Sequence, residues 1–343
     1  MRNLRELNFD ILRGLAIAIM VAAHLADHLL RGPQPTWFVF LGALAAPLFI
    51  FLAGMMVALS FVYKNYPFSY YLKRGLVIFG IAVLVDIAIW QAYPLVSFDV
   101  LYLIAVSIPL TYLFLRLNLS LQMVVIAGLF FATPFLQNMF ITDFSPSIVG
   151  DASVQGEYTG ALAHFFLGGW FPIFPWLPVA FLGALLGTFH RRFFNDLPKG
   201  RSAIAFLSFF FISASSAYFL KDVIVEGNYF RDLMYIPSLV YITWALSSVG
   251  LLFILVQRAQ LFFVGQALSL LGRVALFIYV FHLVIISYIF ESFFSNRLSG
   301  IELTALYLTF VIFLIACAYG IFKIKERRSA LANNRLFRAL FGS

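Results

Sequence analysis

Long apolar segments follow one another along almost the whole chain and are separated by short polar stretches. A helix that crosses a membrane needs about 20 mostly apolar residues, and segments of this length recur throughout. The pattern predicts an all-α polytopic membrane protein with about ten transmembrane helices. We expect these helices near residues 10–30, 37–62, 74–92, 99–116, 121–140, 170–189, 202–220, 234–256, 274–292 and 301–322. The stretch from Ile141 to Ala161 is polar and predicts a loop.

The basic residues are distributed unevenly between the two faces that these helices define. Of the 23 Lys and Arg residues, only Arg31, Lys221, Arg231 and Arg297 fall on the face opposite the N-terminus. Because basic loops are retained in the cytoplasm, both termini are predicted to be cytoplasmic. Residues 1–322 then form a single transmembrane domain. Residues 323–343 form a basic cytoplasmic tail, which is either an amphipathic helix on the membrane surface or a solvated segment that fixes topology.

Composition supports lipid as the main solvent of this chain. Its 343 residues are 63% hydrophobic and 11% charged, whereas soluble domains carry roughly 25% charged residues. The net charge of +8 comes from cations dispersed between apolar segments, which argues against nucleic-acid binding. The single cysteine, Cys317, excludes an internal disulfide and a cysteine-built metal site. We expect a multi-pass protein of a prokaryotic cytoplasmic membrane without a cleaved signal peptide.

The first predicted helix carries two groups of ionisable residues, which are costly in lipid and therefore candidates for function. Asp10 and Arg13 are three residues apart near the cytoplasmic boundary and can pair on one helix face. One interpretation is an ion pair that only fixes topology. The other is an anion site in which Arg13 binds a phosphate and Asp10 holds Arg13 in place.

His24, Asp27 and His28 form the second group, near the outer boundary of the same helix. Asp27 could accept an N–H from His24, which would fix the tautomer of His24 and raise its basicity for general-base catalysis. A structural hydrogen-bond cluster and a proton relay remain open. A zinc site also remains open, but it would need a further ligand from elsewhere in the chain; we expect no metal.

The ninth predicted helix contributes a further histidine, His282, with Tyr279 as its nearest helical neighbour. Arg273 is expected to open this helix on the cytoplasmic side, where it could bind an anion together with Arg13. Asp86 and Asp99 are weaker candidates, and Asp99 is also expected to cap the fourth helix at its N-terminus.

Four motifs follow one another along the chain. They are R-x-x-x-x-D-I-L-R-G-L-A-I-x-x-M-x-x-x-H from Arg5 to His24, APLFIFLAGM from Ala46 to Met55, FPIFPWLPVAFLGALLG from Phe171 to Gly187, and GRVALFIYVFHLVII from Gly272 to Ile286. In this order they resemble the transmembrane acyltransferase superfamily over essentially the whole chain. The resemblance is greatest to the heparan-α-glucosaminide N-acetyltransferase-like and YeiB-like branch, with the acyltransferase-3 family as a more distant relative.

This resemblance implies a membrane acyltransferase that takes an acetyl or other acyl group from cytoplasmic acyl-CoA. The acceptor would be a hydroxyl or amine on the outer side, in a sugar or glycan. The phosphates of the donor would be held by basic residues, with His24 acting as base or transient acyl carrier. The implied donor-binding residues are Asp10, Arg13, Lys73, Arg74, Arg273 and Tyr279, and the implied catalytic residues are His24, Asp27, His28 and His282.

One position departs from the pattern of the sugar N-acetyltransferase branch. That branch carries a histidine in the loop before the second helix, whereas this loop reads RGPQPTW, with Gln34 and Pro35 at that point. His28, one turn from His24, is the expected substitute.

Two other functions are consistent with the ionisable residues. One is a proton-coupled transporter or flippase for an anionic or lipid-linked solute, and the other is a scaffold without chemistry. The cytoplasmic basic cluster favours the enzyme, since a transporter needs no nucleotide-phosphate site there. Membrane lipid is an expected partner, and the sequence leaves a homo-oligomer open.

Overall fold

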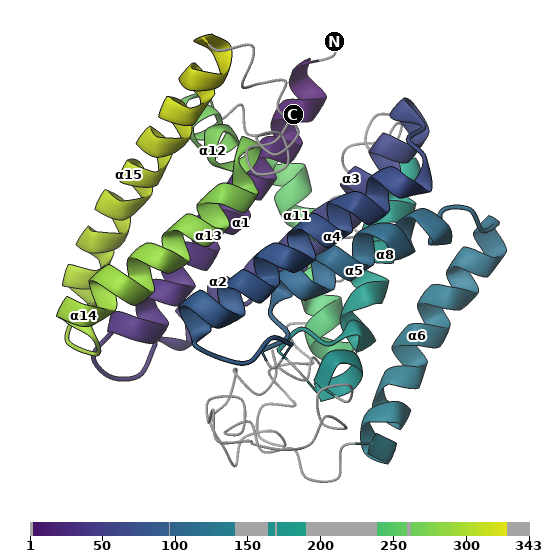
Figure 1. Ribbon diagram of the computed structural model, residues 1–343, viewed down its shortest axis with the longest axis horizontal. Helices are drawn as coiled ribbons and strands as arrows, with labels where there is room; N and C mark the ends of the chain where they lie inside the picture. Colours follow the sequence, from purple (N-terminus) through teal and green to yellow (C-terminus); the bar gives the residue numbers. More distant parts are fainter. Residues whose placement is uncertain are drawn as a thin grey trace. The chain divides into compact units, whose positions relative to one another are not determined.

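The computed structural model describes residues 3–95, 97–140, 164–168, 170–189, 239–258 and 262–327. Within these ranges every regular element is a helix, and one isolated bridge joins Leu30 to Leu298. The chain divides into two compact units, residues 1–49 with 248–343 and residues 50–247, which are described separately. The all-α fold predicted from the apolar pattern is therefore confirmed for the described residues (Figure 1).

The first unit is built around the long N-terminal helix. Its elements are α1 (Asn3–Leu29), α2 (Thr36–Gly42), α12 (Phe262–Arg273), α13 (Ala275–Ile285), η5 (Ile286–Phe290), α14 (Glu291–Phe294) and α15 (Gly300–Arg327). Two helices, α3 (Ala45–Lys64) and α11 (Leu239–Arg258), each contribute residues to both units. Helix α1 contacts α12, α13 and α15, and Figure 1 shows α13 and α15 running beside it.

A stripe of apolar residues on α1 forms the core of this unit. Ile17, Val21, Leu25 and Leu29 recur every four residues and are completely buried. They pack against buried residues of α13 and α15, which include Ile278 and Leu314. Asp10, Gly14, His24 and His28 continue the same three- and four-residue spacing, so these four residues lie on the face that packs against its neighbours, whereas Asp27 is exposed.

Two glycines bring α1 and α12 into close contact. A Cβ atom added at Gly14 would lie 1.9 Å from the carbonyl oxygen of Leu268. A Cβ atom added at Gly272 would lie 1.9 Å from the carbonyl oxygen of Asp10. The later residue of α1 in these contacts, Gly14, meets the earlier residue of α12, Leu268. Helix α12 therefore packs antiparallel to α1. Small residues permit such backbone contact between membrane helices, where dispersion replaces the hydrophobic effect as the main attraction.

The C-terminal end of α1 is tied to the loop that precedes α15. The backbone N–H of Asn296 donates to the His28 carbonyl at 3.1 Å, and that of Leu298 donates to the Leu29 carbonyl at 3.0 Å. The N–H of Arg31 donates back to the Leu298 carbonyl at 2.8 Å. These bonds satisfy carbonyls that a helix end otherwise leaves unpaired. Helix α1 is thus held at two places: α12 contacts it at Asp10 and Gly14, and the loop before α15 contacts it at His28 and Leu29.

The second unit contains the remaining described helices. They are α4 (Phe68–Val85), η1 (Asp86–Trp90), α5 (Val100–Phe114), α6 (Leu119–Phe140), η3 (His164–Gly168) and α8 (Ile173–Thr188). Glycines again permit close packing, because a Cβ atom added at Gly54 of α3 would lie 1.8 Å from the Ala180 carbonyl oxygen of α8. A Cβ atom added at Gly183 of α8 would likewise clash with the Phe51 carbonyl oxygen of α3.

A buried carboxylate organises the segment between η1 and α5. Asp86 is fully buried and accepts hydrogen bonds from the Ser97 hydroxyl at 2.5 Å, the Tyr102 hydroxyl at 2.8 Å and the Leu95 N–H at 3.1 Å. Three donors compensate for the desolvation of this group, which explains its position inside an apolar segment. The predicted cap at Asp99 is confirmed, because its carboxylate accepts the Val100 N–H at 2.6 Å.

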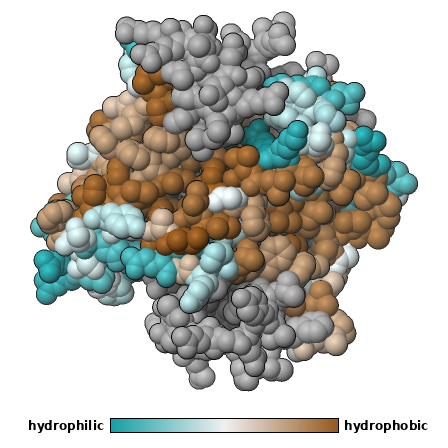
Figure 2. All heavy atoms as spheres, viewed as in Figure 1, coloured by the Kyte–Doolittle hydropathy of each residue, from teal (hydrophilic) through white to brown (hydrophobic). Residues whose placement is uncertain are grey.

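The observed helices agree with the predicted spans over most of the described chain. Five segments are both long and apolar enough to cross a membrane, and three shorter apolar helices accompany them in the described ranges. Apolar side chains are exposed along these helices, and brown apolar residues cover much of the face in Figure 2. The count of ten spans and the location of the termini stay predictions, since the predicted span 202–220 and residues 328–343 lie outside the described residues.

Several helix boundaries differ from the prediction, and α1 already begins at Asn3. Helix α4 begins at Phe68 rather than near residue 74, because Pro67 precedes it and the basic pair Lys73–Arg74 is inside the helix. The predicted second span is confirmed as one apolar segment, Trp37–Lys64, which contains a turn between α2 and α3. Arg273 closes α12 instead of opening the ninth helix. Hydropathy did not predict α12, because its 12 residues are too short for a span.

Candidate active site

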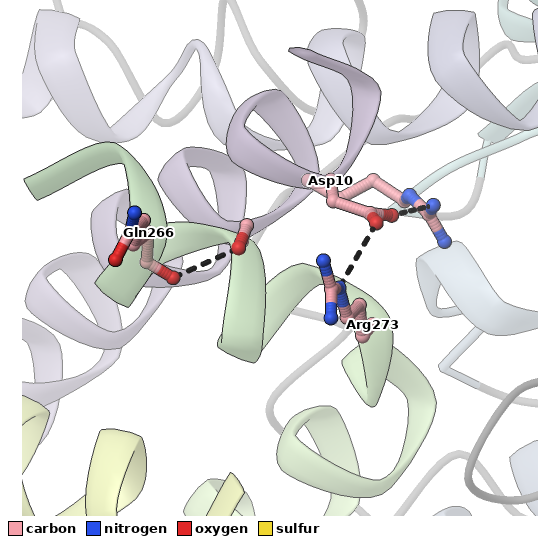
Figure 3. Close-up of polar contacts among 5 residues, drawn as sticks. Asp10, Gln266 and Arg273 are labelled. Atoms are coloured by element: carbon pink, nitrogen blue, oxygen red, sulfur yellow. Dashed lines mark hydrogen bonds and ion pairs between the residues drawn. The ribbon is translucent and has the colours of Figure 1, made fainter. Parts of the chain in front are cut away.

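One end of the candidate site is an ion cluster centred on Asp10. The Asp10 carboxylate pairs with the Arg13 guanidinium one turn away on α1. Its other oxygen lies 3.4 Å from Nε of Arg273, at the end of α12. Figure 3 shows the Arg273 side chain pointing towards the Asp10 carboxylate. The glycine before Arg273 explains this geometry, since Gly272 packs on the Asp10 carbonyl and so brings the next residue beside the Asp10 side chain.

The cluster has an excess of positive charge. Asp10 is buried, with 12% of its side chain exposed, whereas 42% of the Arg273 side chain is exposed. The Arg273 guanidinium also lies over the Phe322 ring of α15, 5.4 Å from its centroid. One carboxylate paired with two arginines leaves a net charge of +1 among these three side chains. Such a planar, charged donor array is suited to phosphate oxygens.

A pair of histidines lies farther along the same helix face. The His24 ring of α1 and the His282 ring of α13 meet edge to face, with centroids 5.4 Å apart and an interplanar angle of 69°. His282 is completely buried, and Tyr279 packs against its ring at 5.7 Å. The sequence placed both histidines inside spans but did not indicate that they would meet.

Backbone hydrogen bonding selects one tautomer of His282. The Nδ1–H group donates to the carbonyl of Ile278 at 2.9 Å, one turn earlier in α13. A neutral imidazole with a proton on Nδ1 carries its lone pair on Nε2. The Nε2 atom is buried and has no hydrogen-bond partner among the described residues. A buried acceptor in this state is suited to take a proton from a ligand.

Two further polar pairs lie beyond the histidines towards the end of α1. Asp27 accepts a hydrogen bond from the Gln34 side chain at 2.7 Å. The Nδ1 atom of His28 lies 3.4 Å from the Glu291 carboxylate of α14. The expected support of His24 by Asp27 stays a prediction. The contacts of Gln34 with Asp27 and of Glu291 with His28 were not predicted, because both depend on how the segments after α1 and α13 pack against the end of α1.

The remaining predicted donor-binding residues lie in two places. Tyr279 is beside His282 in the first unit. Lys73 and Arg74 are exposed on α4 in the second unit, where Arg74 Nη1 donates to the Tyr70 hydroxyl at 3.4 Å. Within the described chain, no group of three His, Cys, Asp or Glu side chains is arranged to bind a metal.

The ion cluster and the histidine pair are separated along α1. Arg13 and His24 are 11 residues apart, which corresponds to about 16 Å of helix at 1.5 Å per residue. The site therefore offers cations at one position and a proton acceptor about three turns away. Such a separation is suited to an elongated anionic ligand whose reactive group lies far from its charges.

Comparison with known proteins agrees with this chemistry. Residues 5–221 match the family model described as heparan-alpha-glucosaminide N-acetyltransferase, catalytic. The matched range includes Asp10, Arg13 and His24 and ends before α12 and α13, so Arg273 and His282 are placed at the site by geometry alone. No match was found among curated proteins.

Proposed function

Because the chain belongs to the heparan-alpha-glucosaminide N-acetyltransferase catalytic family, we propose that it transfers an acetyl group from acyl-CoA to a sugar or glycan acceptor. The family and the apolar helices make it an integral membrane protein. The observation that carries the proposal is the His24–His282 pair, about three helical turns from two arginines that share one carboxylate. Nε2 of His282 is an acceptor with no partner among the described residues.

The ion cluster is proposed to bind the phosphates of the donor. Arg13 and Arg273 offer charge-assisted hydrogen bonds, and Asp10 holds both guanidinium groups in place. In acyl-CoA the pantetheine arm separates the phosphates from the thioester. This length allows the phosphates to bind at the arginines while the thioester reaches the histidine pair.

The histidine pair is proposed to carry out the proton transfer. The acceptor hydroxyl or amine attacks the thioester carbonyl, a new C–O or C–N bond forms, and the C–S bond breaks. Nε2 of His282 takes the proton that the acceptor loses, and the CoA thiolate leaves. His24 packs against this ring and fixes its position. Tyr279 also packs against the His282 ring, and His28 and Asp27 complete the polar end of α1 where the acceptor binds.

The sidedness of the reaction follows from the predicted topology. With both termini in the cytoplasm, Asp10 and Arg13 face the compartment that contains acyl-CoA. His28 and Asp27 then face the outer side of a prokaryotic cytoplasmic membrane, where sugar polymers are found. The acetyl group would thus cross the membrane inside the protein.

Two substitutions on α1 distinguish residues that bind the donor from residues that take part in acetyl transfer. Arg13→Ala should raise the Kd of acetyl-CoA roughly 10- to 100-fold, because a charge-assisted hydrogen bond contributes about 1.5–3 kcal/mol. His24→Ala should abolish transfer and leave this Kd unchanged. Isothermal titration of the purified protein and label transfer from acetyl-CoA measure the two properties.

Arg297→Ala is the matched control, since Arg297 is an exposed arginine of the same unit outside the proposed site. It should leave both properties unchanged. Equal loss of binding and transfer in both α1 variants would mean that these residues only maintain structure.

A further inference from the structure

The proposed reaction leaves a proton in the interior of the first unit. Nε2 of His282 takes this proton from the acceptor, and the His282 side chain is completely buried. Its Nδ1–H is engaged by the Ile278 carbonyl at 2.9 Å, so the proton has to leave through Nε2. Until it leaves, His282 cannot act as a base in a second reaction. The protein therefore needs a path along which this proton reaches water.

Polar side chains lead from the His282 ring towards the C-terminal end of α1. The His24 ring is in edge-to-face contact with His282, with ring centroids 5.4 Å apart. His28 lies one turn beyond His24 on the same face of α1, because residues four apart in a helix are neighbours. Nδ1 of His28 lies 3.4 Å from Oε2 of Glu291, in α14. These four side chains form a histidine–glutamate row (His282, His24, His28 and Glu291) that joins α13, α1 and α14.

Exposure increases along the histidine–glutamate row. His282 is 0% exposed, and His24 is half-buried. The His28 side chain is 24% exposed and the Glu291 side chain is 42% exposed. The row therefore begins at a buried nitrogen and ends at a carboxylate that is accessible to water. Imidazole accepts and releases protons near neutral pH, which suits the three histidines to a proton relay.

A π-helical turn positions the last member of the row. In a regular α-helix, side chains nine residues apart lie on nearly opposite faces, because each residue turns the helix by about 100°. His282 and Glu291 are nine residues apart, but η5 (Ile286–Phe290) intervenes between them. A π-helical turn contains an extra residue and so shifts the faces of the side chains that follow it. Glu291, the first residue after this turn, can therefore reach His28 from the helix segment that carries His282.

We propose that the histidine–glutamate row is a proton exit. The proton that Nε2 of His282 takes from the acceptor passes through His24 and His28 to Glu291, which releases it to water. When the C–S bond breaks, the CoA thiolate keeps the bonding electrons and takes its own proton from water, since thiols are mostly protonated at neutral pH. This inference rests on the proposed function and deepens it, because it assigns a role to Glu291 in resetting His282.

An ion pair that only stabilises the end of α1 is the alternative role of the His28–Glu291 contact. A partly exposed pair of this kind contributes about 0–1 kcal/mol to stability. Its loss would not make the second acetyl transfer slower than the first. The two roles therefore differ in the order of turnovers, which rapid kinetics can resolve.

The experiment uses native membranes that contain the full chain, labelled acetyl-CoA and a rapid quench. Glu291→Gln should form about one acetylated product per protein molecule at the original rate. Later turnovers should be about tenfold slower or more, because His282 stays protonated. Added imidazole, a small proton carrier, should restore the later rate. Glu302→Gln is the matched control, since Glu302 is an exposed carboxylate of the same unit that accepts hydrogen bonds from Ser299. It should retain the original rate throughout.

The outcomes separate this inference from the proposed function. If Glu291→Gln turns over at the original rate, His282 returns its proton to the thiolate or to another group; the inference is then overturned and the function stands. If the first turnover is slowed as much as the later ones, or imidazole restores nothing, Glu291 is structural and the inference is overturned. A burst in Asp27→Asn but not in Glu291→Gln would overturn it as well. If the original protein forms no acetylated product, both are overturned. Should Glu291→Gln not fold, His28→Gln should show the same burst and the same rescue by imidazole.

Discussion

At the scale of single residues, His282 combines complete burial with a defined tautomer. Its Nδ1–H is used by the Ile278 carbonyl, and its Nε2 has no partner in the described part of the chain. A buried polar atom without a partner costs about 1–3 kcal/mol, so its retention needs an explanation. Proton transfer from a bound acceptor supplies one, because the ligand would satisfy Nε2 at the moment of reaction.

His282→Asn tests this role. The asparagine amide can still donate to the Ile278 carbonyl, but it has no atom at the position of Nε2. We expect the rate of acetyl transfer to fall by roughly 10²–10⁴-fold, the usual contribution of a general base, with the Kd of acetyl-CoA unchanged. Label transfer and calorimetric titration measure the two quantities. His282→Gln, which restores a polar but non-basic atom near Nε2, should be equally inactive. A parallel loss of thermal stability and activity in both variants would instead indicate a structural histidine.

The sequence predicted residue contacts that depend on one helix and missed those between helices. The Asp10–Arg13 pair follows from a spacing of three residues, and the structure contains it. Arg273 was expected to act together with Arg13, and the structure places both on Asp10. The meeting of His24 and His282 has no local signal, because it depends on how α13 packs against α1. Gln34 and Glu291 were missed for the same reason.

At the scale of elements, α12 is the helix that completes the ion cluster. Its contact with α1 depends on Gly14 and Gly272, which allow each backbone to reach the other. The last residue of α12, Arg273, then reaches Asp10. The packing of these two helices is therefore coupled to the proposed phosphate site.

Gly14→Ala should weaken both the fold and donor binding. The added Cβ would lie 1.9 Å from the Leu268 carbonyl oxygen, so α12 must move away from α1. Overpacking of this kind costs about 1–3 kcal/mol of unfolding free energy. We expect a lower thermal midpoint and a higher Kd for acetyl-CoA.

The matched control is Gly320→Ala in α15, where no atom lies within 4 Å of the added Cβ. This change should raise stability by about 0.5–1 kcal/mol, because alanine loses less conformational entropy in a helix. If Gly14→Ala were as stable as Gly320→Ala, the close packing of α1 and α12 would be wrong.

Hydropathy predicted helices that are long and apolar but not α12. A window of about 20 residues identifies a span. The 12 residues of α12 are shorter than this window, so the segment was interpreted as a connection between two spans. The start of α4 was misplaced because Lys73 and Arg74 were interpreted as marking the point where the span begins, whereas both lie inside the helix. Proline supplied the better signal, since Pro67 fixes the start of that helix.

At the scale of the whole molecule, composition and charge predicted an integral membrane protein, and the family match and apolar helices support this class. The division into two units could not be predicted, because α3 and α11 each belong to both and no linker marks the boundary. A single transmembrane domain and a basic tail stay predictions. The proposed chemistry lies in the first unit.

The most direct test of the central claim follows the fate of the acetyl group in native membranes, which supply every available acceptor. Membranes that contain the protein receive acetyl-CoA with a labelled acetyl group, and membranes with His24→Ala serve as the reference. We predict labelled glycan or sugar-lipid, with one free CoA thiol released per acetyl group transferred, and no labelled product with His24→Ala. Equal labelling in both membranes, or label that crosses the membrane without release of CoA, would contradict the account and favour a transporter.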